Sequence, residues 1–148
     1  MMTESSVEIG AAAPIVWDVF TDVEQWPSWT SSVTELVALD GPGIEIGKRF
    51  QIKQPRMPKL VWEVTDVDPG GSWTWRVKSL GSTTLATHEL VEQGDGKTLV
   101  RQRIDQRGPI GSTVGALMRG MTKRYLELEG QGLKTRSEER RRQNASPA

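Results

Sequence analysis

Residues 12–29 read AAPIVWDVFTDVEQWPSW, and this stretch organises the start of the chain. Pro14 favours the first turn of a helix, because the N–H that proline lacks would be unpaired there in any case. Apolar residues then recur at the i, i+3, i+4 and i+7 positions of one helix face: Val16, Val19, Phe20 and Val23. Pro27 disfavours helical angles at the residue before it. We therefore predict an amphipathic helix from residue 13 that Pro27 stops, followed by a turn over 26–29.

Alternation of apolar and polar residues on both sides of this stretch predicts strands. Val7, Ile9 and Ala11 alternate with polar residues before it. After it come six strand-like runs of 6–10 residues, each ended by turn residues: 33–39, 49–54, 60–67, 72–80, 83–91 and 97–106. Short turns between such runs indicate an antiparallel meander, since parallel strands need much longer crossovers.

The last predicted element is a long helix over about 112–136. Its apolar residues follow a helical period along one stripe: Val114, Leu117, Met118, Met121, Tyr125 and Leu128. A curved antiparallel sheet of seven strands wrapped around this helix would bury the stripe and one sheet face together. We therefore predict a single α+β domain over residues 1–136, with an apolar cavity between sheet and helix. Residues 137–148 contain no apolar run able to dock, and we expect a disordered charged tail.

Composition excludes several classes of function. The 148 residues contain no cysteine and a single histidine, His88, so we expect no metal site and no cofactor. The chain has 19 basic and 19 acidic residues, and outside the segment from Lys134 onward the balance is net acidic, which disfavours nucleic-acid binding. No apolar run is long enough to span a membrane, and the start of the chain lacks the features of a signal peptide. We expect a cytoplasmic protein.

The stretch 12–29 resembles the N-terminal signature of the polyketide cyclase/dehydrase and lipid-transport family of the START-like helix-grip superfamily. Segments 46–50, 62–69 and 73–75 are similar to the strand pattern of that family, and 108–111 is similar to its helix opening. The resemblance spans about residues 5–136. It implies the helix-grip fold, with two short helices after the first strand. It also implies a small hydrophobic ligand, of an aromatic, polyketide-like or lipid-like kind.

Eight residues are candidates for the wall of such a cavity: Phe50, Trp62, Trp73, Trp75, His88, Met118, Met121 and Tyr125. Trp73 and Trp75 are two residues apart, so they point to the same face of their strand. Each of these aromatic residues could equally be ordinary core. The three other tryptophans, Trp17, Trp26 and Trp29, belong to the helix and turn near the start, where packing is the simpler role.

His88 is the candidate acid/base residue, because its ordinary pKa lies near neutrality. A buried structural histidine is the alternative, and no second catalytic group is placed by spacing.

Two glycine pairs stand out in the helical region. Gly130 and Gly132 are expected in a frayed helix end, whereas Gly111 and Gly115 could leave space for a ligand to enter.

We therefore expect a monomer or weak homodimer that binds a small hydrophobic molecule. The alternative is a polyketide cyclase/aromatase or dehydratase that uses the same cavity, with His88 in proton transfer. An interaction module acting through the basic residues at 140–142 is a third possibility. Sequence alone leaves open the ligand, any turnover and the sheet face of five charged residues: Glu63, Arg76, Arg101, Arg103 and Asp105.

Overall fold

The computed structural model describes residues 1–145, in which seven antiparallel strands form one sheet. The strands are β1 (Met2–Ile9), β2 (Glu35–Ala38), β3 (Arg49–Lys53), β4 (Leu60–Asp68), β5 (Ser72–Ser79), β6 (Ser82–Gly94) and β7 (Lys97–Arg107). Their order is β1-β7-β6-β5-β4-β3-β2, so β1 and β2 are the sheet edges. Five of the six neighbouring pairs are consecutive in sequence, because short turns suffice to join antiparallel strands. The predicted α+β meander is confirmed.

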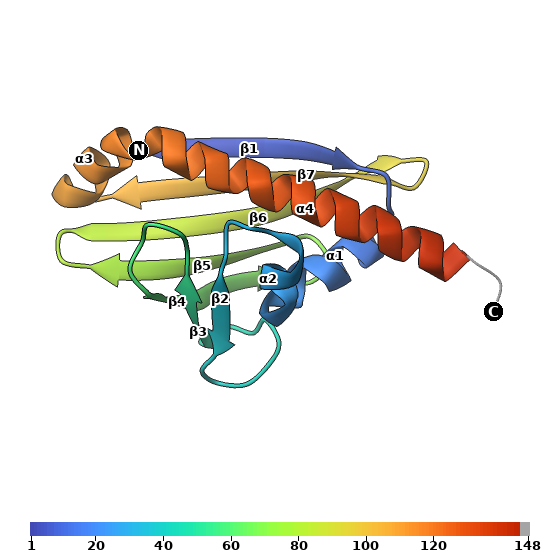
Figure 1. Ribbon diagram of the computed structural model, residues 1–148, viewed down its shortest axis with the longest axis horizontal. Coiled ribbons are helices and arrows are strands. Elements are labelled where there is room, and N and C mark those ends of the chain that lie inside the picture. The colour runs from blue at the N-terminus through green and yellow to red at the C-terminus, as the bar shows by residue number, and fades with distance from the viewer. Residues whose placement is uncertain (146–148) are drawn as a thin grey trace.

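One long helix crosses the inner face of this sheet. The helix α4 (Arg119–Ala145) runs diagonally over it, and α3 (Pro109–Leu117) caps one end of the sheet (Figure 1). The small helices α1 (Ala13–Thr21), η1 (Val23–Gln25) and α2 (Trp26–Trp29) cover the part near the other end of α4. A register shift in β4 between Val64 and Asp66 marks a bulge, and bulges increase the local bend of a strand.

The two faces of the sheet have opposite chemistry. Inward residues alternate along β5 and β6, with Trp73, Trp75 and His88 almost completely buried. The charged residues lie on the outer face, where they form cross-strand ion pairs such as Arg76–Glu63 at 3.2 Å. The pair Arg101–Glu89 at 2.8 Å joins β7 to β6 in the same way, and Arg103 pairs with Glu4 of β1. These ion pairs place Glu63, Arg76, Arg101 and Arg103 on the outer face, and Asp105, the fifth residue whose face the sequence left open, pairs with Arg107 on the same strand at 2.6 Å.

The first helical region differs in detail from its prediction. We expected one helix that Pro27 stops, but α1 ends at Thr21 and Pro27 lies in the first turn of α2. Proline is well tolerated there, because first-turn N–H groups have no partner within the helix. The indole Nε1 of Trp26 donates to the Phe20 carbonyl oxygen at 2.9 Å, which fixes α2 against α1. The two short helices implied by the resemblance are therefore present.

The C-terminal helix also differs from its prediction. The chain breaks at Met118 into α3 and α4, and the expected tail is wrong for residues 137–145, which continue α4. Ser137 is fully buried, and the carboxylate of Glu138 accepts a hydrogen bond from the Gly10 N–H at 2.7 Å. Polar contacts with the end of β1 thus anchor a segment that lacks apolar residues; the last three positions of the expected tail, 146–148, lie outside the described residues.

Within residues 1–145, no helix combines the length and apolar character needed to cross a membrane.

The buried stripe of α4 is shifted from the predicted one. Residues of the predicted stripe in α3 are exposed, with Leu117 at 82% and Val114 at 38%. The residues of α4 that are buried against the rest of the protein are Leu126, Glu129, Gly130, Leu133 and Ser137. Glu129 is the one carboxylic acid among these five residues, and its burial is the feature on which the candidate site depends.

Candidate functional site beneath the long helix

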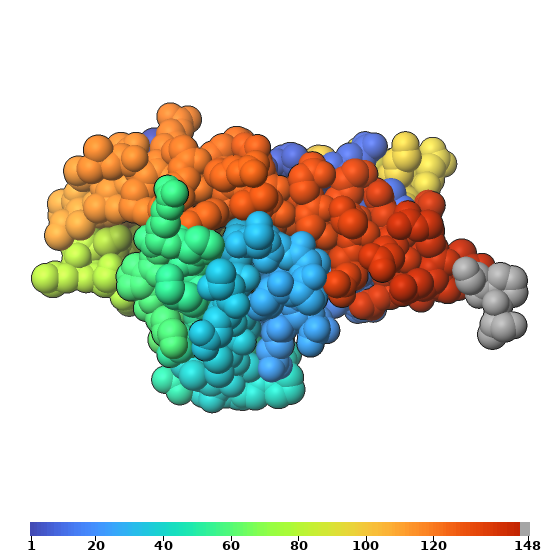
Figure 2. All heavy atoms as spheres, viewed as in Figure 1, coloured from blue at the N-terminus to red at the C-terminus, as the bar shows by residue number. Residues whose placement is uncertain are grey.

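Two adjoining cavities lie between α4 and the inner sheet face, with volumes of about 50 and about 90 Å³. The residues that line both are Gln54, Trp62, Ile104, Leu126 and Glu129. The smaller cavity extends toward Trp26 and His88, and the larger one toward Met57 and Tyr125. In Figure 2, α4 and the segment between β3 and β4 cover this region from the viewing side. The cavities are therefore bounded by a helix above, the sheet below and a loop at one side, and they are partly open to solvent.

Tryptophan side chains fill much of the space that the curved sheet encloses. Trp26, Trp62 and Trp75 line the smaller cavity, with ring centroids 5.5 Å apart for Trp26–Trp75 and 5.8 Å apart for Trp62–Trp75. Trp73 packs edge-on against Trp75 at 4.7 Å and has no exposed surface. These rings account for the modest cavity volumes, since ligand pockets are commonly about 300–1,000 Å³.

His88 is buried at the base of the smaller cavity. Its ring stacks on Trp73 at a centroid distance of 3.8 Å, and Nδ1 lies 3.1 Å from the Trp73 carbonyl oxygen. Because a carbonyl oxygen only accepts, Nδ1 carries the proton and Nε2 does not. Burial lowers the pKa of His88 to about 3, against a smaller opposing effect of the Trp73 hydrogen bond. The ring is therefore neutral at pH 7 and poorly suited to act as a general acid there.

Glu129 is the titratable group that sequence reasoning missed. It lies on the buried stripe of α4, is 6% exposed and lines both cavities. Burial raises the pKa of this carboxyl to about 8, and the nearby Ser32 hydroxyl lowers it by a smaller amount. The side chain is therefore mainly protonated at pH 7. Its spacing from Leu126 and Leu133, three and four residues away, was a usable sequence signal.

Two glutamines add further polar atoms to the inner face. Gln102 on β7 donates from Nε2 to the Leu126 carbonyl oxygen at 3.3 Å, while its buried Oε1 has no hydrogen-bond partner within residues 1–145. Gln106 lines the larger cavity, and its Oε1 is likewise unpartnered in the described part of the chain. A Cβ on Gly115 would lie 2.5 Å from that Oε1. The space beside Gly115 is thus occupied by Gln106 and is not the opening we expected.

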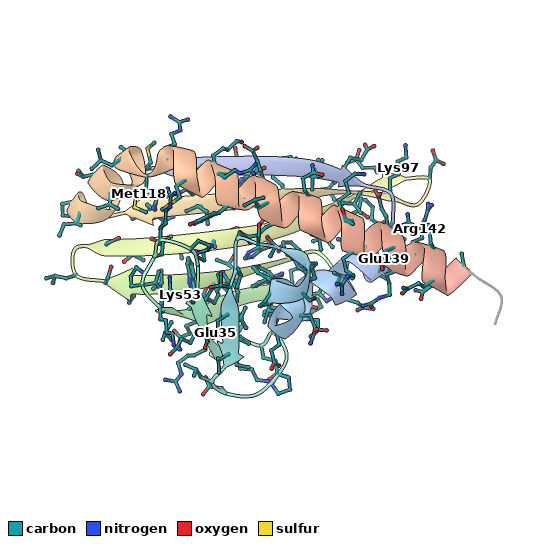
Figure 3. The ribbon with its side chains drawn as sticks, in the orientation of Figure 1. Glu35, Lys53, Lys97, Met118, Glu139 and Arg142 are labelled. Carbon is teal, nitrogen blue, oxygen red and sulfur yellow. The ribbon has the colours of Figure 1, made fainter. Side chains whose placement is uncertain are left out.

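A tether holds the loop at the mouth of the larger cavity. The hydroxyl of Tyr125 on α4 donates to the carbonyl oxygen of Pro55, in the loop between β3 and β4. The ammonium of Lys53 donates to the carbonyl oxygens of Gln54 and Met57 in the same loop. Figure 3 labels Lys53 at the end of β3 where this loop begins. Movement of the loop would widen the larger cavity, because Gln54 and Met57 are part of its wall.

The predicted ligand-wall residues divide into two groups. Trp62, Trp75, His88 and Tyr125 line one or both cavities. The other four do not line them: Phe50, Trp73, Met118 and Met121. Phe50 and Trp73 are fully buried core, whereas Met118 lies at the α3–α4 junction (Figure 3). A role in ligand contact stays a prediction for all eight residues.

A wider hollow on the outside of the protein has a different character. It has a volume of about 540 Å³ where β1 meets the start of α4, beside Glu4, Arg119 and Lys123. It is open to solvent, and the Lys123 ammonium reaches across it to the Glu4 carbonyl oxygen. No group of three or more His, Asp or Glu side chains among residues 1–145 is arranged to hold a metal ion. The cavities beneath α4 remain the candidate site.

The fold defines a class of protein: a helix-grip domain, in which a curved antiparallel sheet wraps around a long C-terminal helix. An aromatase/cyclase of Streptomyces sp. R1128, named Zhui, superposes with a TM-score of 0.80 over 99% of both chains at 14% identity. A START superfamily protein of Mycobacterium smegmatis gives a TM-score of 0.70 at 16% identity, covering 93% of this chain and 97% of that one. At these identities the likeness concerns the fold alone.

Sequence comparison identifies the family. Residues 2–138 match the model of the family described as polyketide cyclase / dehydrase and lipid transport, and the chain belongs to this family. A protein of Streptomyces halstedii, named provisionally as a polyketide cyclase, is 28% identical over 112 residues. That alignment covers 74% of this chain and 91% of the relative. The resemblance seen in the sequence is confirmed.

Proposed function

We propose that this protein binds a small hydrophobic molecule in the two cavities beneath α4. The observation that carries the proposal is a concave space beneath α4 with a wall of tryptophan and aliphatic side chains and a few polar groups converging on it. Such a combination is typical of small-molecule sites. Burial of an apolar ligand would supply the affinity, at roughly 25 cal/mol per Å² of apolar surface removed from water.

A ligand larger than the present cavities requires them to widen. The two cavities, of about 50 and about 90 Å³, are both lined by Trp62, Leu126 and Glu129. Rotation of the Trp62 ring and displacement of the loop tethered to Tyr125 would join and open them. We therefore expect slow entry, with the loop between β3 and β4 as the moving part.

Filling the smaller cavity should abolish binding. Ala86 on β6 is 4% exposed and lines this cavity, so Ala86→Leu would place three further carbon atoms in the ligand space. We expect affinity for a neutral hydrophobic probe, a naphthalene derivative without a charged group, to fall by at least tenfold. Isothermal titration calorimetry measures the affinity, and urea unfolding reports any cost of overpacking, typically about 1–3 kcal/mol.

The matched control is Ala116→Leu, the same substitution at an exposed position of α3. It should leave affinity within twofold of the unaltered protein. Equal affinities for the two variants would place the ligand outside the cavity and contradict the proposal. Absence of binding by any hydrophobic probe to the unaltered protein, with no compound retained on purification by native mass spectrometry, would also contradict it.

A cyclase or dehydratase activity in the same cavity is the second candidate. Glu129 favours it, since a carboxyl with a pKa of about 8 is a proton donor at neutral pH. His88 was the candidate for this role in the sequence, but with a pKa of about 3 its ring is neutral at pH 7. The one remaining N–H, at Nδ1, is hydrogen-bonded to the Trp73 carbonyl oxygen. We therefore assign proton donation in this alternative to Glu129.

A kinetic comparison separates the two functions. With a synthetic poly-β-ketone thioester as the probe, an enzyme should release a product that has lost water, detected by mass spectrometry. Glu129→Gln should then slow the reaction by about 10²–10⁴, the usual contribution of general acid–base catalysis. A pure binding protein would retain the thioester unchanged, and conversion at an equal rate by the glutamine variant would exclude Glu129 as the proton donor.

A further inference from the structure

Two hydrogen-bond acceptors on residues of the smaller cavity wall are open to a ligand. His88 Nδ1 is occupied by the Trp73 carbonyl oxygen, which leaves Nε2 as an acceptor without a partner among residues 1–145. Gln102 donates one Nε2 hydrogen to the Leu126 carbonyl oxygen, and its Oε1 acceptor is unpartnered in that range. In both cases the partner is a backbone carbonyl oxygen, which can only accept a hydrogen bond. The nitrogen that faces it must carry a hydrogen, and this fixes the tautomer of His88 and the amide orientation of Gln102.

These two acceptors are neighbours on the sheet. His88 on β6 pairs directly with Gln102 on β7, and both side chains point inward. Directly opposite residues on adjacent antiparallel strands have Cβ atoms about 4.5–5.5 Å apart. One polar group of a ligand can therefore reach both side chains. A buried acceptor without a hydrogen-bond partner is unfavourable. A ligand that supplies a donor to it should therefore bind more tightly than a ligand of the same shape that does not.

The charges around the cavity exclude an anionic ligand head. Arg103 is the cationic residue that contributes to the cavity wall, but its guanidinium pairs with Glu4 on the outer face of the sheet. The hydroxyl of Tyr125 is engaged by the Pro55 carbonyl oxygen. Glu129 supplies no positive charge in either protonation state. A carboxylate or phosphate would thus be dehydrated next to acceptors, with no counter-ion in the described part of the wall.

We infer that the ligand is uncharged and carries a hydroxyl donor, phenolic or enolic, seated between His88 Nε2 and Gln102 Oε1. Its apolar body lies against Trp26, Trp62 and Trp75, and the carboxyl of Glu129 lies within the same cavity. This inference rests on the proposed binding function and adds a selection rule to it. The two acceptors discriminate between ligands, because they favour a ligand that donates a hydrogen bond over one that lacks a donor.

Three probes that share one ring system test the rule. We would measure the binding of 2-naphthol, 2-methoxynaphthalene and 2-naphthoate by calorimetry at pH 7, with the indole N–H signals of a ¹⁵N-labelled sample as a second readout. 2-Naphthol should bind several-fold to about tenfold more tightly than the methyl ether, which lacks the donor. 2-Naphthoate should bind most weakly. Equal or tighter binding of the ether or the anion would overturn the inference.

Variants locate the effect. Gln102→Met keeps the side-chain length and removes the acceptor, and His88→Phe keeps a ring against Trp73 and removes Nε2. Each should reduce the preference for 2-naphthol over its ether, whereas Gln131→Met on the exposed face of α4 should retain it. A preference that survives in both cavity variants would also overturn the inference.

The outcome distinguishes this inference from the proposed function. If the three probes bind equally and Ala86→Leu abolishes all of them, the cavity binds ligands without the rule, and only the inference fails. If none of the three binds to the unaltered protein, the inference and the binding of compounds of this size fail together. If one variant does not fold, the comparison of probes on the unaltered protein still decides.

Discussion

Glutamine in place of Glu129 is expected to raise the free energy of unfolding by a few kcal/mol at pH 8, with almost no change at pH 4. The folded protein holds a proton on this carboxyl up to a pKa of about 8, whereas in the unfolded chain the value returns to about 4.5. Between these values the folded state binds more protons than the unfolded state. Stability therefore falls as pH rises through this window, by about 1.4 kcal/mol for each pH unit.

The measurement is urea unfolding of both proteins from pH 4 to pH 9. The two stability curves should separate above pH 4.5 and run parallel again above pH 8, because glutamine stays neutral and keeps a donor and an acceptor near Ser32. Glu127→Gln is the matched control on the exposed side of the same helix, and it should shift stability by less than about 0.5 kcal/mol. Curves for Glu129→Gln and the unaltered protein that coincide at pH 8 would show that the carboxyl is not buried as described.

His88 acts on the same curve in the opposite direction. Its folded pKa of about 3 lies below the ordinary value of 6.5, so the unfolded chain binds the extra proton as pH falls. The stability contributed by the neutral ring is present above pH 6.5 and is lost progressively toward pH 3. Between pH 4.5 and 6.5 the two slopes oppose each other, and these two groups together favour a stability maximum in that interval.

Alanine in place of Gly132 is expected to destabilise the protein by about 2 kcal/mol or more, although alanine is the better helix former. A Cβ at this position would lie 2.0 Å from the backbone carbonyl oxygen of Trp29 and 2.9 Å from its ring atom Cε3. Backbone cannot rotate away as a side chain can, so α2 would have to move off α4. That movement would shift Trp26, which lines the smaller cavity.

Gly120→Ala is the matched control, with the same substitution in the same helix. A Cβ there meets no atom within 4 Å, and the position is exposed. It should stabilise the protein by up to about 1 kcal/mol through helix propensity alone. Opposite signs for the two variants in urea unfolding would establish the close approach of α2 to α4. Stabilisation by both would refute it and restore the frayed helix end that the sequence suggested for Gly132.

Local pattern accounts for most of the fold. The spacing of Trp73 and Trp75 predicts correctly that they share one face of their strand, because a strand directs successive side chains to opposite sides. The structure shows that this face is the inner one and that His88 is buried on the same side. The same rule could not orient the charged strand residues, since it does not state which face is solvent. Cross-strand pairs such as Arg76–Glu63 required the register of β4 against β5.

The candidate site was less predictable, because burial depends on what packs against a residue. In the sequence, Glu129 is one acid in a charged helix, while Met118 and Met121 look like an apolar wall. The chain breaks at Met118; α4 then packs with Glu129 buried, whereas Leu117 at the end of α3 is exposed. The helical period alone does not show whether the stripe with Leu117 or the stripe with Glu129 is buried, since each of the two stripes is only partly apolar.

By itself, then, the sequence determined the family, through its motifs. It also determined the order of the elements and which residues of a central strand share a face, because these follow from short-range periodicity and turn residues. Only the tertiary structure decided which inward groups meet an open space. Trp73 and Trp75 point the same way, yet Trp73 is enclosed by Phe20, Trp26 and the ring of His88, whereas Trp75 borders the cavity. Neighbours distant in sequence make that difference, and they also set the protonation of His88 and Glu129 by removing water from both.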